Sequence, residues 1–190
     1  MKPMETASPR RPSSRRARRS SGRELLDFVL VLMPMLATLT VLVDTAWAIY
    51  AESTLQRAVR IGVRTGVTLT ATSPLITTYG DLTTAVKNVV QSNSFGLLNG
   101  TSGYAKIKVN YYLPPPPSST SAATDVSTQA QGDASGNIMK VSVQNFSLVP
   151  LMPRIYANNV AVDNNPLIIS VNSADMIEPS RNPPPIGTAP

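Results

Sequence analysis

The sequence predicts an α+β fold, in which one long N-terminal helix continues into a small domain with a short second helix and an antiparallel sheet. Two hydrophobic periods carry this prediction. Apolar residues in the first half of the chain recur at helical spacing, and those in the second half alternate with polar residues as in half-buried strands. An uninterrupted apolar run near the N-terminus indicates that part of the first helix lies in a membrane.

The apolar run covers residues 28–51 and contains one charged residue, Asp44. About 20 helical residues cross a hydrocarbon core that is about 30 Å thick, because each residue adds about 1.5 Å along the axis. The run is therefore long enough to span a bilayer. We assign residues 23–51 to a transmembrane helix.

Residues 1–22 form a basic leader of Arg, Ser and Pro with hardly any apolar side chain. Such a segment cannot bury enough apolar surface to offset the entropy of ordering, so we expect it to be disordered. The net charge of +6 arises in this leader. An Arg-rich segment can bind nucleic-acid phosphates, but the apolar run directly behind it favours a role in membrane orientation, and we expect no nucleic-acid partner.

The charges that flank the apolar run predict its orientation. More Lys and Arg residues precede Phe28 than follow Ala51 closely. Positive residues beside a membrane helix tend to stay in the cytoplasm. We therefore expect a single-pass protein with a cytoplasmic N-terminus and with residues 52–178 in the periplasm or outside the cell.

Helical periodicity continues behind the apolar run to about Thr70, which predicts that the second part of the long helix lies across the small domain. One face is small or apolar and comprises Leu55, Ala58, Val59, Gly62 and Gly66. Another face carries Arg57, Arg60 and Arg64, a row typical of a solvated surface or of lipid-headgroup contact. Each glycine costs a helix roughly 1 kcal/mol relative to Ala. We therefore expect tertiary contacts there, with another backbone in close approach.

A second helix is predicted after the break at Ser73-Pro74. Asp81 can cap its N-terminus, and apolar residues recur on one side as far as about Asn93. Behind this helix the period changes to two. Strands are predicted over residues 104–113, 138–149 and 167–173.

The second of these strands contains a predicted bulge near Asn145, because Phe146 and Leu148 follow in the opposite phase to Val143. Residues 114–136 consist of prolines followed by polar residues, and we expect an exposed, disordered loop between the first two strands. We expect the tail, residues 179–190, to be disordered as well. The exported domain therefore covers residues 52–178.

The chain has no cysteine and no histidine. Disulfides, thiolate or imidazole metal ligands and the usual base of a nucleophilic triad are therefore excluded. The acids of the exported part show no recognisable catalytic spacing. They are Asp81, Asp125, Asp133, Asp163, Asp175 and Glu178. We expect a protein that is not an enzyme and that holds no metal or cofactor.

Gly22 and Arg23 stand where the basic leader meets the apolar run, in the stretch GRELLDF. A hydrophilic leader that ends in glycine, with an acid five residues further on, is similar to the class III signals that prepilin peptidases cut. By this resemblance the cut falls between Gly22 and Arg23, and Asp27 becomes the fifth mature residue. Glycine lets the backbone enter a narrow active site. An acid at the start of an apolar helix can pair with a neighbour's new amino terminus.

The wider sequence resembles the TadE family of pilus assembly proteins. The stretches LDFVLVLMP and VLVDTAWAIYAESTLQRAVRIGVRTG carry the resemblance, and VNSADMIEP near the end is similar to the close of such proteins. Asp44 corresponds to a late Asp or Gly of the family's membrane helix. The counterparts behind it are Leu55, Gln56, Ala58, Arg60 and Arg64. Asp27 replaces the family's usual Glu, and Pro34 lies one residue later than in the family pattern.

Asp27, Pro34 and Asp44 are our candidate residues for helix assembly. Asp44 either contacts a partner within a helix bundle or reaches water at the outer interface. Pro34 either serves assembly or only kinks the helix, which transmembrane helices tolerate.

The resemblance implies a pilin-like architecture and a structural role as a minor pilin-like subunit, or pseudopilin, in the assembly of a Tad-type type IV pilus. Such pili serve adhesion and biofilm formation. The implied partners are the bacterial inner membrane, other minor pseudopilins, the major pilin, the pilus platform proteins and a prepilin peptidase.

A cleaved secretory signal is the alternative. Ala46-Trp47-Ala48 has the small-x-small form that signal peptidase recognises, and a cut after Ala48 would release a secreted or surface protein of the adhesin kind. The long apolar run and the helix that continues beyond Ala51 favour retention in the membrane.

Overall fold

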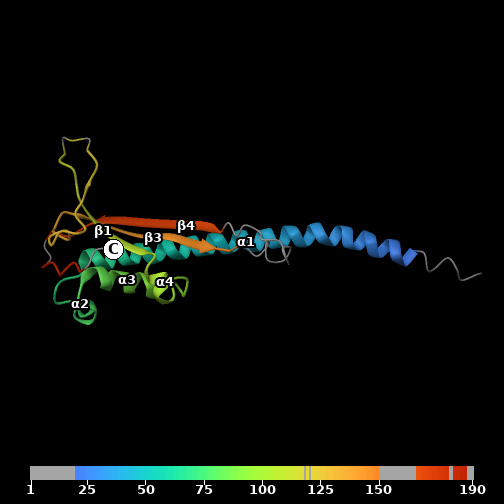
Figure 1. Cartoon of the computed structure of the whole chain (residues 1–190), viewed down its shortest axis with the longest axis horizontal. Helices are drawn as coiled ribbons and strands as arrows, with labels where there is room; N and C mark the ends of the chain where they lie inside the picture. The colour runs from blue at the N-terminus through green and yellow to red at the C-terminus, as the bar shows by residue number, and fades with distance from the viewer. Residues whose placement is uncertain (1–19, 118, 120, 150–165, 180–181, 188–190) are drawn as a thin grey trace, which may run out of the picture. The chain divides into compact units, whose positions relative to one another are not determined.

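The computed structural model describes residues 20–117, 119, 121–149, 166–179 and 182–187 (Figure 1). In chain order the elements are α1 (Ser20–Thr68), α2 (Pro74–Tyr79), α3 (Leu82–Ser92), α4 (Gly100–Tyr104), β1 (Ile107–Leu113), β2 (Thr124–Asp125), β3 (Ile138–Leu148) and β4 (Leu167–Met176). The predicted α+β class is confirmed: a long apolar N-terminal helix precedes short helices and a small antiparallel sheet. Contacts divide the chain into two units, Met1–Val43 and Asp44–Pro190, and α1 contributes to both.

The sheet has the strand order β2-β1-β3-β4, and all neighbouring strands are antiparallel. Alternate residues of the three longer strands are buried, as period-two patterning requires. The buried face comprises Ile107, Val109, Tyr111, Met139, Val141, Val143, Ile169 and Val171. The three predicted strands are present with changed ends. β1 begins at Ile107 and not at residue 104, because Gly100–Tyr104 forms α4. β3 ends one residue before the predicted end, at Leu148, and β4 runs three residues beyond the predicted end at Ser173.

The predicted bulge in β3 is confirmed. The register against β4 shifts between Val143 and Phe146, and Asn145 has a φ of 55°. Asn tolerates this left-handed conformation better than most residues. The extra residue places Phe146 and Leu148 on the buried face. The apolar side of the strand is therefore continuous, although the alternation in the sequence changes phase at the bulge.

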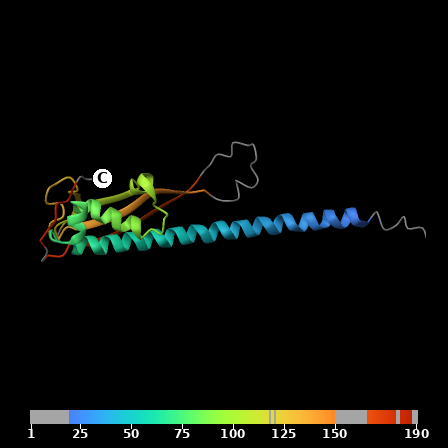
Figure 2. The same ribbon diagram turned by 90° about the horizontal axis from the view of Figure 1, so that it is seen from below.

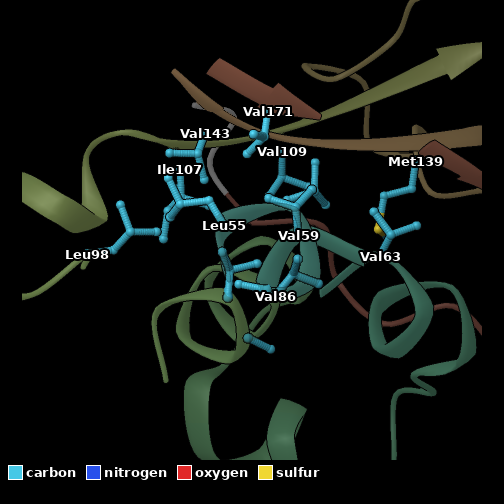
Figure 3. Packing of buried hydrophobic residues seen from close by; sticks show 14 of the residues in the cluster. Leu55, Val59, Val63, Val86, Leu98, Ile107, Val109, Met139, Val143 and Val171 are labelled. Carbon is cyan, nitrogen blue, oxygen red and sulfur yellow. The ribbon is translucent and has the colours of Figure 1, made fainter. Parts of the chain in front are cut away.

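The part of α1 that is C-terminal to Asp44 packs on the buried face of the sheet together with α3 (Figures 1 and 2). Leu55, Val59 and Val63 point from α1 toward residues of β1, β3 and α3 (Figure 3). The core begins on α1 at Ala51, which is fully buried. The predicted extension of the first helix across the domain is therefore confirmed.

Gly62 and Gly66 mark the closest approach of α1 to its neighbours. A Cβ added to Gly62 would lie 2.4 Å from Cγ2 of Val90, and one added to Gly66 would lie 2.6 Å from Sδ of Met139. No real Cβ tolerates such distances without a shift of its neighbours. The expected tertiary contact is present, but the expectation of a close backbone was wrong: the nearest atoms are side chains of α3 and β3 in the same chain.

The predicted second helix is α3. The carboxylate of Asp81 caps it: Oδ1 accepts a hydrogen bond of 2.7 Å from the amide of Thr84, and Oδ2 accepts one of 2.9 Å from the Thr84 hydroxyl. These contacts satisfy one of the amides that a helix N-terminus leaves without a partner. The apolar side of α3 is buried, with Val86 and Val90 fully inaccessible to solvent.

The expectation of a disordered loop over residues 114–136 was wrong for its second half. There β2 pairs with the end of β1, and Val126, Ser127 and Asp133 are buried. The Ser127 hydroxyl accepts a 2.9 Å hydrogen bond from the amide of Tyr111. Polar residues pack here because they bond to the backbone at the outer edge of β1, which composition does not reveal.

The expectation of a disordered tail was wrong for residues 182–187. The amide of Leu82 donates to the Pro185 carbonyl at 2.9 Å, and the amide of Thr83 donates to the Ile186 carbonyl at 3.2 Å. Ile186 is buried in the core. The tail thus supplies backbone acceptors to amides in the first turn of α3 that have no partner within the helix.

Three short elements, α2, α4 and β2, were not predicted. The first helix begins at Ser20 rather than at the predicted residue 23, and it ends at Thr68. Behind it the amide of Thr70 donates to the Ser73 hydroxyl at 2.9 Å. The expected disorder of residues 1–19, most of the leader, lies outside the described residues and stays a prediction.

Candidate membrane anchor and assembly helix

The N-terminal part of α1 exposes a continuous apolar surface. Leu30 is 73 % exposed and Phe28 is 63 % exposed, although both belong among the most buried residue types of folded proteins. The most apolar stretch of the helix has a mean hydropathy of 2.3, and none of it is buried within the chain. An apolar surface of this extent marks contact with a membrane or with other proteins.

Within the part of the chain that the structure describes, α1 is the one helix long and apolar enough to cross a membrane. Its 49 residues correspond to a length of about 74 Å, more than twice the hydrocarbon thickness of about 30 Å. One part can therefore lie in a bilayer while the other forms the core of the domain. The change occurs near Ala51, where the exposed apolar residues end and the buried ones begin.

Gly22 and Arg23 lie in the first turns of α1 and are both exposed. Nothing lies within 4 Å of a Cβ added to Gly22, and its φ is not in the left-handed region. Packing and backbone conformation thus set no requirement for glycine at this position. A glycine inside a helix is less stable than Ala by roughly 0.5–1 kcal/mol, so its presence here has no explanation within the described fold.

Asp27 and Pro34 are also exposed on α1. The helix continues through Pro34, which has no N–H to donate to the carbonyl of Leu30. The Thr38 hydroxyl donates to the carbonyls of Pro34 at 2.6 Å and of Met35 at 3.1 Å. Such bonds let a hydroxyl lie in an apolar helix without an unsatisfied donor.

Asp44 is half-buried and lies at the start of the second unit. Trp47 and Tyr50 follow on the next turns with their rings stacked at a centroid distance of 5.5 Å. Aromatic side chains with one polar atom concentrate at membrane–water interfaces. The five predicted site residues (Gly22, Arg23, Asp27, Pro34 and Asp44) are thus spread along one helix, and the fold gathers them into no pocket among the described residues.

The acids of the domain have local structural roles. Asp81 caps α3, and Asp175 accepts a hydrogen bond from the amide of Met176. The hydroxyl and the amide of Ser127 both donate to Asp125 and hold the pKa of that carboxyl below its ordinary value. In the described part of the chain, no three residues of the types His, Cys, Asp and Glu lie close enough together to hold a metal ion. Asp163 lies outside the described residues.

Comparison with known families gives a match, and it lies within α1. Residues 25–64 match the family model described as TadE-like protein. This segment is similar to that family. It contains Asp27, Pro34 and Asp44, and it runs from the exposed apolar surface into the buried part of α1. No match was found among curated proteins or among solved structures.

The TadE-like segment begins behind Gly22 and Arg23 and ends well before residues 171–179. The processing site and the resemblance at the C-terminal end therefore stay predictions. The structure shows that the segment similar to the TadE-like family belongs to a helix that is long and apolar enough to span a membrane, and that the C-terminal part of this helix lies in the core of an α+β domain.

Residues beside the TadE-like segment were missed by sequence reasoning. Phe95 lies behind α3 with a φ of 50°, and the Arg57 guanidinium lies 5.8 Å from the centre of its ring. Leu167 and Ile168, at the start of β4, line a hollow together with residues 45, 48, 49 and 52 of α1. Only the tertiary structure brings these residues next to α1, and the sequence carries no signal for them.

Proposed function

We propose that this protein is a structural, pilin-like minor subunit that acts in the assembly of a Tad-type pilus in a bacterial inner membrane. One observation carries the proposal: the TadE-like match over residues 25–64 coincides with the part of α1 that exposes its apolar side chains. A helix whose apolar surface is unused within its own chain can be stored in a bilayer and then packed beside similar helices in an assembly.

The two parts of α1 divide this work. Residues 23–51 hold the chain in the membrane with the N-terminus in the cytoplasm, as the basic leader favours. Residues beyond Ala51 form the core of the exported domain with α3 and the sheet.

A prepilin peptidase is the proposed first partner. Cleavage between Gly22 and Arg23 removes the basic leader, and the lack of any packing requirement for glycine at position 22 supports a role for it in processing. The new α-amino group on Arg23 is largely protonated at neutral pH. It can pair with Asp27 of a neighbouring subunit inside an apolar bundle, where an unpaired charge is costly.

Intact-mass measurement of the protein extracted from membranes tests this proposal. In a strain with an active prepilin peptidase we expect a mature chain that begins at Arg23. Gly22→Val should leave the chain uncut, because a β-branched side chain crowds the site, and it should abolish assembly. Ala17→Val, a comparable change inside the leader, is the control and should be cut normally. A wild-type chain that begins at Met1 or Lys2 would refute the processing, and one that begins at Ile49 would support secretion instead.

Asp44 tests the assembly role independently of processing. If Asp44 contacts another helix, Asp44→Leu should impair piliation while the amount of protein in the membrane stays unchanged. Normal piliation in this variant would remove Asp44 from the assembly residues and favour the other interpretation, in which the carboxylate reaches water at the interface.

A further inference from the structure

The end of the domain that lies nearest Asp44 exposes apolar and aromatic side chains. Phe95 is 68 % exposed, Ile168 is 60 % exposed and Leu167 is 49 % exposed. Trp47 and Tyr50 expose about half of their surface on α1. We call these five residues, together with Arg57, the proximal surface. Among the large apolar residues described behind residue 51, Val149 is also exposed at this end, whereas Tyr79, Leu113 and Met176 are exposed elsewhere.

The proximal surface flanks α1 on two sides. Phe95 lines a hollow with Tyr50, Ser53, Thr54 and Arg57 of α1. Leu167 and Ile168 line another with Thr45, Ala48, Ile49 and Glu52. At 100° per residue, these two sets of α1 residues are centred about 140° apart around the helix. The domain therefore presents one apolar projection on each side of the helix that anchors it.

Helix geometry gives the depth of these two apolar projections relative to the membrane. The apolar run starts at Phe28, and about 20 residues cross the hydrocarbon core, so its outer edge falls near Trp47. The start of β4 lines a hollow with residues 45, 48, 49 and 52 of α1, and these residues lie at the depth of this edge. The hollow with Phe95 begins at Tyr50, about 5 Å further out, where the headgroups lie.

The chemistry of the proximal surface fits lipid better than water. Trp and Tyr accumulate at the headgroup level, because each has an apolar ring and a polar group. Phe is among the apolar residues that interfacial segments bury between headgroups and acyl chains. Arg57 adds a cation next to Phe95 that can reach a lipid phosphate with its long side chain. The backbone of Phe95 adopts a left-handed conformation that bulky residues rarely occupy, and its ring is exposed.

We propose that the proximal surface rests on the outer leaflet of the membrane, so that the domain binds lipid directly on both sides of its anchor. This inference rests on the proposed membrane insertion of α1. Leu167 and Ile168 lie at the boundary between headgroups and acyl chains, and Phe95 with Arg57 lies in the headgroup layer. The lipid contact restricts tilting of the domain about the anchor before assembly.

Single nitroxide labels test the proposal on the full chain. The protein has no cysteine, so Phe95→Cys, Ile168→Cys, Ser135→Cys and Val31→Cys each supply one labelling site. Ser135 is exposed before β3, at the opposite end of the strands from Ile168, and it is the matched aqueous control. Each labelled protein is placed as a single copy in nanodiscs of phosphatidylethanolamine and phosphatidylglycerol. Its depth is measured from collisions with oxygen and with a water-soluble nickel chelate.

The label at residue 31 should lie in the hydrocarbon, and the label at residue 168 should lie within about 5–10 Å of the boundary between headgroups and acyl chains. The label at residue 95 should lie further out than the label at residue 168 but be protected from the chelate relative to residue 135. If the labels at 95 and 168 are as accessible to the chelate as the label at 135, the lipid contact is refuted while the anchor stands.

Two further outcomes separate the remaining explanations. If the label at residue 31 is itself in water, the membrane anchor of the proposed function fails, and the lipid contact fails with it. If the labels at 95 and 168 are aqueous in nanodiscs but become protected in cells that assemble pili, the surface binds another subunit and the lipid assignment is overturned. Thermal unfolding confirms that each variant is folded, and Leu167→Cys replaces Ile168→Cys if that variant is not.

Discussion

Gly62 lies where α1 touches α3, and its lack of a side chain sets the distance between the two helices. The nearest atom to an added Cβ belongs to Val90, a β-branched residue with little freedom to rotate away. Gly66 has the same relation to Met139 and Val86. These glycines lower the stability of the isolated helix. In the folded domain they allow close packing against α3 and β3, and this packing compensates for the loss.

We predict that Gly62→Ala and Val90→Ala interact in stability. Alone, Gly62→Ala overpacks the contact at a cost of about 1–3 kcal/mol, which the better helix propensity of Ala offsets by about 1 kcal/mol. In the double variant, the methyl group added at residue 62 occupies the space that the side chain of Val90 leaves when it is shortened. The double variant should therefore be more stable than the sum of the single effects by about 0.5–3 kcal/mol.

Denaturant unfolding of the full chain in mild detergent measures this interaction. Arg60→Ala, on the exposed face of the same helix, is the control and should combine additively with Val90→Ala. Additive effects of Gly62→Ala and Val90→Ala would contradict the direct contact.

At the scale of elements, the beginning of α3 depends on two parts of the chain that are far apart in sequence. Asp81 caps the helix as the residue that directly precedes it, and the carbonyls of residues 185 and 186 accept hydrogen bonds from the amides of Leu82 and Thr83. Gly187, with a φ of 82°, passes so close to the Asp81 carboxylate that any side chain there would collide with it. The C-terminal segment is thus part of the support for α3.

We predict that Ile186→Ala destabilises the domain by about 2 kcal/mol, the lower end for an Ile→Ala change because the residue lies at the edge of the core. Hydrogen exchange should become faster at the amides of Leu82 and Thr83, since both donate to this segment. Pro183→Ala, at an exposed position of the same segment, is the control and should leave exchange unchanged. Protected amides in Ile186→Ala would show that the segment does not hold α3.

For the whole molecule, the charges that flank α1 predict its orientation in a membrane. The basic residues precede the apolar surface, and the TadE-like segment follows directly behind them. The chain has no cysteine, so the domain folds without disulfides. Its stability rests on the apolar core and on backbone hydrogen bonds.

We predict that a reporter enzyme active only outside the cytoplasm is active when fused behind Pro190 and inactive when fused before Met1. The positive leader stays in the cytoplasm, and the helix behind it crosses once. The intact domain should remain with membranes after a carbonate wash. The opposite pattern of reporter activity would overturn the orientation, and a soluble periplasmic domain would favour cleavage after Ala48.

The sequence by itself determined the elements in which buried and exposed residues alternate regularly. The anchor follows from an apolar run in residues 28–51, the C-terminal half of α1 and α3 follow from three- and four-residue spacing, and β1, β3 and β4 follow from alternation. Even the bulge at Asn145 was visible, because the phase of alternation changes there. The sequence reveals these elements because each turn of such a helix, and each pair of residues in such a strand, has a buried and an exposed side.

Only the tertiary structure decided how the remaining segments pack. β2 and residues 182–187 attach through backbone donors and acceptors, and every residue except proline carries both, so composition does not distinguish them from a free loop. The approach of Phe95 and of Ile168 to α1 depends on where distant segments end in space. The candidate residues on α1 were found from their order along the sequence and from the family resemblance. The proximal surface joins α1, β4 and the turn that follows α3, and it exists only in the folded domain.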